Sequence, residues 1–188
     1  CIRDSLTINT DNFTTGGTAT FLSTGGGATF TLTGETAATI IDVGSSAAGG
    51  TGLDISEVEL QDVASTFSTI AIGMDTSQTG AVTVNDAGGL TALNSGLTLR
   101  SEGSGGSVTI GSTIDLTNTT SSSLLVEGTS IHLDGSVNTD SGGVTFTGPV
   151  EINAAVAIDT ENGANHAGGN VSFSSTVVAQ DGSSDSLT

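Results

Sequence analysis

The C-terminal half of the chain alternates apolar and polar positions in short segments of two or three residues that come in pairs. The first segments of these pairs are residues 108–110, 124–126, 144–146 and 171–173, and the second segments are residues 114–116, 131–133, 150–152 and 177–178. The first segments advance by 16, 20 and 27 residues, and the second segments by 17, 19 and 27 residues. Because both series advance nearly in step, we interpret each pair as part of one structural repeat.

The alternation and the repeat length together predict the fold. Apolar side chains at every second position are typical of β-strands, and repeats this short must stack into a solenoid to bury their apolar faces. Residues 82–84, 90–93 and 97–99 form three apolar segments within one turn, and Val137 and residues 156–158 continue a third side, 19 residues apart. This pattern predicts one all-β domain over residues 1–188, a triangular parallel β-helix with right-handed winding. We interpret it as a segment of a longer shaft.

The N-terminal third contains strand patterns and one helical pattern. Strands are predicted over residues 6–8, 18–22, 29–33 and 39–43, between glycine-rich turns. Residues 54–66 instead space their apolar positions as a helix does, with Asp54 or Ser56 as N-cap and acidic residues in the first turn. We expect a short helix lying across the solenoid, followed by a strand over residues 68–72 that Gly73 ends.

The repeat alignment also predicts which side chains form the core and where the chain leaves it. Val144, Phe146, Ile152 and Val171 are expected to be buried, with Phe146 stacked on Phe173. The last repeat is longer because of residues 161–168, which are small and polar. Insertions in solenoids project outward, so we expect an outward surface loop there.

The charge of the chain excludes some classes of partner. The chain has twenty acidic residues and only two basic ones, Arg3 and Arg100, which gives a net charge of −18. Nucleic acid and anionic membrane surfaces are therefore disfavoured, because both need clustered basic side chains. Such acidity favours solubility in a salty medium in which divalent cations screen the charge. No apolar run has the length of a membrane span, so membrane insertion is not expected.

Cys1 is the only cysteine, which excludes an intrachain disulfide. Its position at the first residue leaves three interpretations: a lipid-modified residue, an intermolecular link, or an incidental cut in a longer chain.

Metal binding has one candidate site in the aligned second segments. Their central residues are Asp115, His132 and Glu151, which would face outward on neighbouring repeats about 4.8 Å apart. Such a ladder offers ligands for a transition metal. An exposed ladder in which His132 separates like charges is the competing interpretation, since three ligands on a flat face do not enclose an ion.

Calcium is the candidate cofactor. The segments 134–135 and 181–185 resemble fragments of calcium loops, with Asp181 and Asp185 as candidate ligands. The EF-hand loop and the Gly-Gly-x-Gly-x-Asp repeat are both missing from the sequence. Ordinary Asx turns explain the same residues equally well.

Catalysis has little support in the residues. The chain has no Trp or Tyr to hold sugar rings and only two arginines to handle acidic sugars. Carboxylates are plentiful, so paired acids for glycoside hydrolysis remain an alternative. We therefore expect a protein that is not an enzyme, with no catalytic residue.

Two segments carry a resemblance to a known family. Residues 52–73, and residues 142–153 together with 167–173, resemble elements of large repetitive bacterial cell-surface proteins of the filamentous-haemagglutinin-like, β-helical adhesin type. The resemblance implies a secreted, extracellular or cell-surface protein with a structural or adhesive role. It implies neighbouring repeats, other copies, or cell-surface and matrix glycans as partners.

Three alternatives to this reading follow from the residues. The first is a carbohydrate-active enzyme on the same scaffold. The second is a subunit of a head-to-tail filament, because residues 4–7 and 185–188 have the same sequence, Asp-Ser-Leu-Thr. The third is a threonine face for ice or another ordered surface, which ranks last because Asp115, His132 and Glu151 interrupt the best-aligned face.

Overall fold

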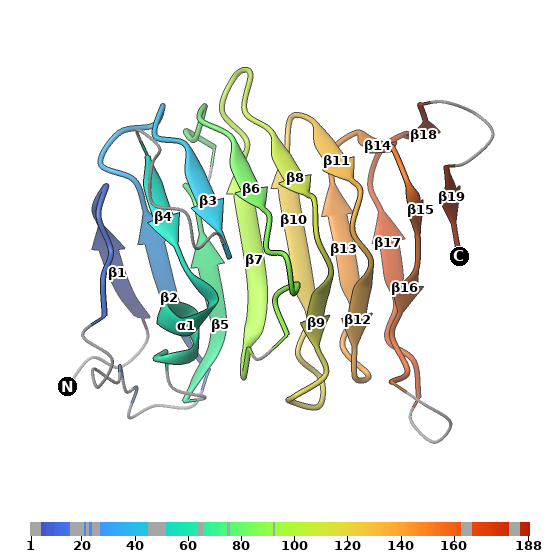
Figure 1. Ribbon diagram of the computed structural model, residues 1–188, viewed down its shortest axis with the longest axis horizontal. Helices are drawn as coiled ribbons and strands as arrows, with labels where there is room; N and C mark the ends of the chain where they lie inside the picture. Colours follow the sequence, from blue (N-terminus) through green and yellow to red (C-terminus); the bar gives the residue numbers. More distant parts are fainter. Residues whose placement is uncertain are drawn as a thin grey trace.

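The computed structural model describes residues 5–15, 21, 23, 27–44, 52–63, 66–74, 76–91, 93–162, 167–180 and 185–188, and Cys1, Arg3 and Asp181 lie outside this part. It is a parallel β-helix, as the sequence predicts (Figure 1). Every strand pairing within the described residues is parallel, from β1–β2 at one end to β15–β19 at the other.

Three sheets form the sides of the solenoid. The first sheet consists of β1 (Ser5–Asn9), β2 (Ala28–Thr33), β5 (Phe67–Ile72), β7 (Gly96–Ser101), β10 (Leu124–Gly128), β13 (Val144–Thr147) and β17 (Val171–Phe173). The second sheet consists of β4 (Leu53–Ile55), β3 (Ile41–Val43), β6 (Val82–Val84), β8 (Val108–Ile110), β11 (Ile131–Leu133), β14 (Val150–Ile152) and β18 (Val177–Ala179). The third sheet consists of β9 (Ile114–Leu116), β12 (Val137–Thr139) and β16 (Ile158–Asp159), and β15 (Ala155–Val156) pairs with β19 (Ser186–Leu187).

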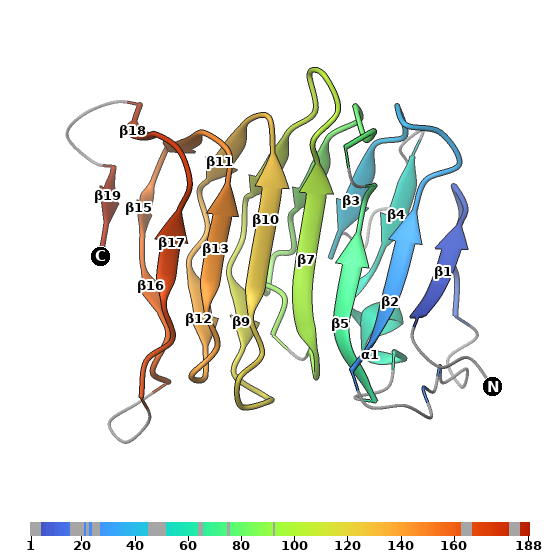
Figure 2. The ribbon, with the colours of Figure 1, turned by 180° about the vertical axis from the view of Figure 1, so that it is seen from behind.

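The winding is right-handed. In Figure 1 the chain rises along the first sheet at the back, descends along the second and third sheets in front, and advances from left to right. Figure 2, seen from behind, shows the same sense of winding with the first sheet in front. From β5 onward each turn passes through the first, second and third sides in that order, and we call one such turn a rung. Before it, β4 follows β3 in the chain but pairs with the edge of β3 that faces away from β6.

The core consists of columns of apolar side chains, one above another in register. In the first sheet one column contains Ile8, Leu32, Ile72, Leu99, Val126, Phe146 and Phe173. Phe146 is fully buried and its ring stacks on that of Phe173, with centroids 5.0 Å apart, as predicted. Val144 and Ile152 are buried as well, but the prediction for Val171 is wrong: this side chain is 43% exposed, because no further strand covers β17 in the structure.

At the other end of the solenoid, aromatic rings gather over the first rungs. Phe30 of β2 lies against Phe13, Phe21 and Phe67, with ring centroids 5.2–6.2 Å apart. Phe13 is buried although it follows β1 outside any strand. This cluster covers apolar surface at the N-terminal end, in contrast with the partly exposed Val171 of the last rung.

The helix is shorter than predicted and begins where its cap allows. Helix α1 spans Glu57–Gln61, and Ser56 is its N-cap, in a capping box with Glu59. The alternative cap, Asp54, belongs instead to strand β4. Leu60 is the buried residue of the helix, which lies at the lower end of the molecule in Figure 1, as do β9, β12 and β16. Strand β5 follows, and Gly73 ends it with a positive φ of 90°, as expected.

At the corners between sheets, buried side chains donate hydrogen bonds to backbone carbonyl groups. At one corner the fully buried Gln78 donates from Nε2 to the carbonyl oxygen of Thr39 at 2.5 Å. Ser101 donates to the carbonyl oxygen of Gly80 at 2.8 Å. A Cβ at Gly80 would lie 2.1 Å from the Thr39 oxygen, so a larger residue cannot occupy this position without moving the backbone.

The side to which two early segments belong was predicted wrongly. Strand β8, aligned above with residues 124–126, pairs instead with β6 and β11 in the second sheet. Strand β9, aligned with residues 131–133, pairs instead with β12 in the third sheet. The later segments are correctly aligned, and residues 82–84, 90–93 and 97–99 do occupy three sides of one turn, with Leu90 bridging to Ile114. The third side continues from Val137 to Ile158, not to Val156.

The outward loop was predicted over residues 161–168. Glu161, Asn162, Ala167 and Gly168 are exposed, in agreement with that prediction, and residues 163–166 lie outside the described part.

The buried ring of Phe146 gives a direct test of the column. We expect Phe146→Ala to lower the free energy of unfolding by about 3–5 kcal/mol, because it leaves a cavity between two rungs. Phe173→Ala, in the same column but partly exposed on the last rung, is the matched control and should cost clearly less. Urea unfolding of the two variants measures the difference, and equal losses would contradict the burial gradient along the column.

Candidate binding surface

The outer face of the first sheet carries mainly hydroxyl groups. Alternation places one column of central outward residues along it: Thr7, Thr31, Ala71, Thr98, Leu125, Thr145 and Ser172. Threonine suits this position because its β-branched side chain favours a strand and its hydroxyl tolerates water. The prediction against a threonine face for an ordered surface concerned a different face, the one assigned to Asp115, His132 and Glu151.

The first sheet is almost uncharged, although the chain carries a net charge of −18. Its strands contain two charged residues, Arg100 of β7 and Glu127 of β10. These are register partners, and Arg100 Nε donates to Glu127 Oε2 at 2.6 Å. The pair neutralises itself, so this face lacks the acidity found on the other two sides.

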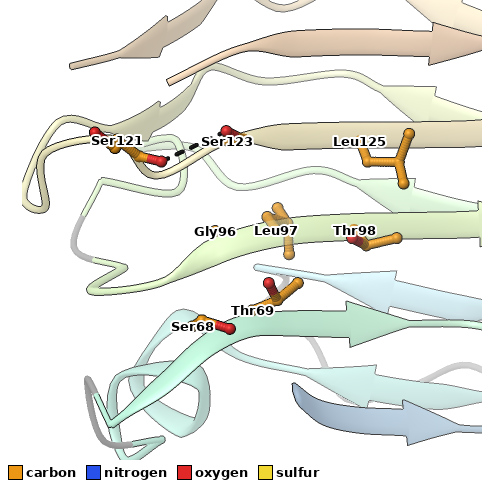
Figure 3. Close-up of a pocket in the computed structure, with 8 residues that line it drawn as sticks. All are labelled: Ser68, Thr69, Gly96, Leu97, Thr98, Ser121, Ser123 and Leu125. Carbon is orange, nitrogen blue, oxygen red and sulfur yellow. Dashed lines mark hydrogen bonds between the residues drawn. The ribbon is translucent and has the colours of Figure 1, made fainter. Parts of the chain in front are cut away.

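A hollow interrupts this face where three strands begin. It has a volume of about 380 Å³ and lies over β5, β7 and β10, lined by Ser68, Thr69, Gly96, Leu97, Thr98, Ser121, Ser123 and Leu125 (Figure 3). Gly96 lies where a Cβ would come within 3.0 Å of the Ser123 carbonyl oxygen, and Ala71 and Leu125 break the threonine pattern on either side of Thr98. On this face, these three residues prevent a regular Thr-x-Thr array, whereas Asp115, His132 and Glu151 lie on other sheets.

Thr98 is the most unusual residue of the hollow. It points outward by alternation, yet its side chain is only 6% exposed, because Ala71 and Leu125 lie on either side of it in register. Within the described residues its hydroxyl has no hydrogen-bond partner, and in Figure 3 the oxygen lies on the side of Gly96. The oxygen is still open to solvent, since the buried side-chain atoms without a partner in the described part of the chain are Asp62 Oδ2 and Gln78 Oε1.

The serines around the hollow are held in place by the backbone. Ser68 donates to the carbonyl oxygen of Ala28 at 3.2 Å. Ser123 Oγ accepts from the amide of Gly143 at 3.2 Å and lies 3.5 Å from the carbonyl oxygen of Ser121, the contact drawn in Figure 3. These hydroxyls therefore form a fixed rim, while that of Thr98 remains available inside it.

The predicted Asp115–His132–Glu151 ladder does not form, because its first member lies on another side. Asp115 belongs to the third sheet, opposite Asn138, and it accepts a hydrogen bond from Thr117 at 2.6 Å. His132 lies between Thr109 and Glu151 in the second sheet. The mistaken assignment of β8 and β9 explains this error.

His132 and Glu151 are brought together as predicted. His132 Nδ1 lies 3.3 Å from Glu151 Oε2, and the same oxygen accepts from Gln180 Nε2 at 3.1 Å. Across the described part of the chain, no group of three or more His, Cys, Asp or Glu side chains is placed to hold a metal ion. The pair is thus a cross-strand contact on the outer face of the second sheet.

The calcium candidates receive no support as a site. Asp134 accepts a hydrogen bond from the side-chain amide of Asn153 at 2.8 Å, across one corner of the solenoid. Asp185 is described and has an interaction of its own, whereas Asp181 lies outside the described residues. Calcium binding stays a prediction.

One acidic pair does stack at close range on the second sheet. Asp42 of β3 and Asp54 of β4 are register partners and both face outward. Partial burial, and secondly the neighbouring Asp54 carboxylate, raise the pKa of Asp42 above its usual value of 3.8. The pair lies on a different sheet from the hollow, and the carbohydrate-active enzyme stays an untested alternative.

No family model, no curated protein and no solved structure matches the chain. The resemblance to β-helical adhesins therefore stays a prediction. Within the described residues, no helix is long and apolar enough to cross a membrane.

Sequence reasoning missed the hollow. The strand pattern of Gly96-Leu-Thr-Leu was visible, but the neighbours of Thr98 come from strands about 27 residues before and after it in the sequence. Only the correct side assignment of β5, β7 and β10 brings these residues together.

The raised pKa of Asp42 gives a pH-dependent prediction. A raised pKa means that the ionised carboxylate destabilises the fold above that pKa, and that the cost vanishes below about pH 3.8, where the group is protonated in both states. We expect Asp42→Asn to raise the free energy of unfolding by about 0.5 kcal/mol at pH 7, because the amide avoids both the partial burial of a charge and the repulsion by Asp54.

Urea unfolding at pH 7 and near pH 3.5 tests this prediction, and the gain should be lost at the lower pH. Asp54→Asn is the control: it removes only the charge repulsion and should give a smaller gain. A loss of stability in Asp42→Asn at pH 7 would contradict the argument.

Proposed function

We propose that this chain is a structural and adhesive shaft segment of an extracellular bacterial surface protein or fibre. The observation that carries the proposal is the unbroken set of apolar columns along the solenoid, in which each rung packs only on its neighbours. Such a body is stiff and extended by construction, and added rungs lengthen it without a new core.

The distribution of charge supports an exposed, extracellular setting. Acidic side chains gather on the second and third sides and at the corners, including Asp42, Asp115 and Asp159. This charge keeps an extended body soluble in salt. The first sheet, nearly uncharged, is the surface on which an adhesive contact with a neutral partner meets the least repulsion.

The surface role can be tested on intact cells that produce the protein. Immunogold labelling with antibodies against the folded chain should decorate the cell exterior or fibres extending from it, and external protease should remove the signal. Labelling that requires permeabilised cells would contradict the proposal, with a cytoplasmic protein as control for cell integrity.

A second candidate function is head-to-tail assembly of copies of this chain, favoured by the last rung. Three side chains of that rung, Val171, Val177 and Leu187, are about two-fifths exposed. Within the described residues, β17, β18 and β19 each pair along one edge only. Open parallel edges with apolar side chains recruit further strands. A contact between this end and the β1 end of another copy does not close on itself and builds a filament.

Assembly is tested with one substitution at an inward position and a control substitution at the next residue, which points outward. The wild-type chain should form rods as its concentration rises, with an axial repeat near 34 Å for the seven strands of the first sheet at about 4.8 Å each. Val177→Lys places a charge in the inward column and should abolish the rods. Val178→Lys, outward on the same strand, should leave them unchanged.

Sedimentation velocity and negative-stain images measure this outcome. A wild-type chain that stays monomeric at all concentrations, or equal effects of the two lysine variants, would exclude stacking through this rung.

A further inference from the structure

We propose that the hollow over β5, β7 and β10 binds one ring of an uncharged glycan. The inference deepens the adhesive part of the proposed function and depends on it for its biological setting. Its chemistry depends only on the residues that line the hollow.

The Thr98 hydroxyl points to a ligand with hydroxyl groups of its own. Thr98 as a residue is more than nine-tenths buried, but its hydroxyl is open to the solvent of the hollow and has no hydrogen-bond partner within the described residues. A sugar hydroxyl both donates and accepts, so it can satisfy Thr98 whichever way the threonine hydrogen turns. The fixed rim hydroxyls of Ser68 and Ser123 offer further contacts.

The remaining lining matches the apolar side of a sugar ring. Gly96 lies between Thr69 and Ser123 in the lining, and Leu125 supplies an apolar wall. A pyranose has C–H groups on its faces, which can pack on Leu125. It has hydroxyls at its edge, which can hydrogen-bond to the serine and threonine hydroxyls of the hollow. The volume of about 380 Å³ lies at the lower end of the roughly 300–1,000 Å³ typical of small-molecule sites, which suits a single ring.

Charge selects among sugars. The lining residues carry no charge, and Arg100, the one cation described on this sheet, is paired with Glu127. With a net charge of −18 on the chain, uronates and sialic acids are repelled, and a neutral hexose is the sugar class that fits.

The affinity of one such hollow should be weak. Its lining includes no aromatic ring, and it is open on one side, so we expect a dissociation constant of about 1 mM for a single ring. Many copies on one surface would raise the effective affinity through multivalent contact.

The test uses methyl glycosides of glucose, galactose and mannose, with methyl galacturonoside as the charged comparison. Amide NMR spectra of the ¹⁵N-labelled chain should shift around Gly96, Thr98 and Leu125 with at least one neutral glycoside at millimolar concentration. The uronoside should bind at least fivefold more weakly. No shift with any neutral glycoside, or equal binding of the uronoside, overturns the proposal.

Two valine variants separate binding from folding. Thr98→Val keeps the shape and removes the hydroxyl, so binding should weaken at least fivefold while the melting temperature stays the same or rises. Thr145→Val changes the same outward column outside the hollow and should bind as the wild type does. Equal binding by wild type and Thr98→Val at matched stability overturns the assignment of Thr98.

The result also distinguishes this site from the surface role. If the chain is labelled at the cell surface but binds no glycoside, the proposed surface role holds and the proposed glycan site is wrong. If the chain binds glycosides but is found only inside cells, the glycan site holds and the proposed adhesive role is wrong.

Discussion

The parallel hydrogen-bond ladder between successive rungs is the constraint on which this structure depends. It holds neighbouring strands about 4.8 Å apart and in register, so each inward side chain lies directly over its equivalent in the next rung. A three-residue strand such as β8 buries two side chains, Val108 and Ile110, and gains its stability only from the rungs above and below. Apolar residues must therefore recur at matching positions, which produces the columns of the core.

The same ladder arranges the outer faces, where charge decides which stackings are tolerated. Arg100 beside Glu127, and His132 beside Glu151, place complementary groups in register. Asp42 beside Asp54 places like groups in register, and partial burial together with this neighbour raises the pKa of Asp42. The first sheet avoids the problem by carrying hydroxyls, which leaves one neutral side on a strongly acidic body.

The sequence predicts the fold class well because spacing and alternation are local properties of the chain. It does not say which side of the solenoid a segment occupies. Val108-Thr-Ile110 has the same pattern as Val144-Thr-Phe146, but six residues, 102–107, separate β7 from β8, whereas two residues separate β10 from β11. The longer corner makes β8 look like the start of a new rung. The hollow around Thr98 was hidden for a related reason, because its walls come from three rungs.

The first and last described rungs differ in how they are held together. At one end Phe13, Phe21, Phe30 and Phe67 interlock across the first rungs. At the other end the strands of the last rung have one neighbour each and leave Val171 and Val177 partly exposed. Because the phenylalanine rings link several of the first rungs to one another, these rungs would yield to a pulling force together and not one by one.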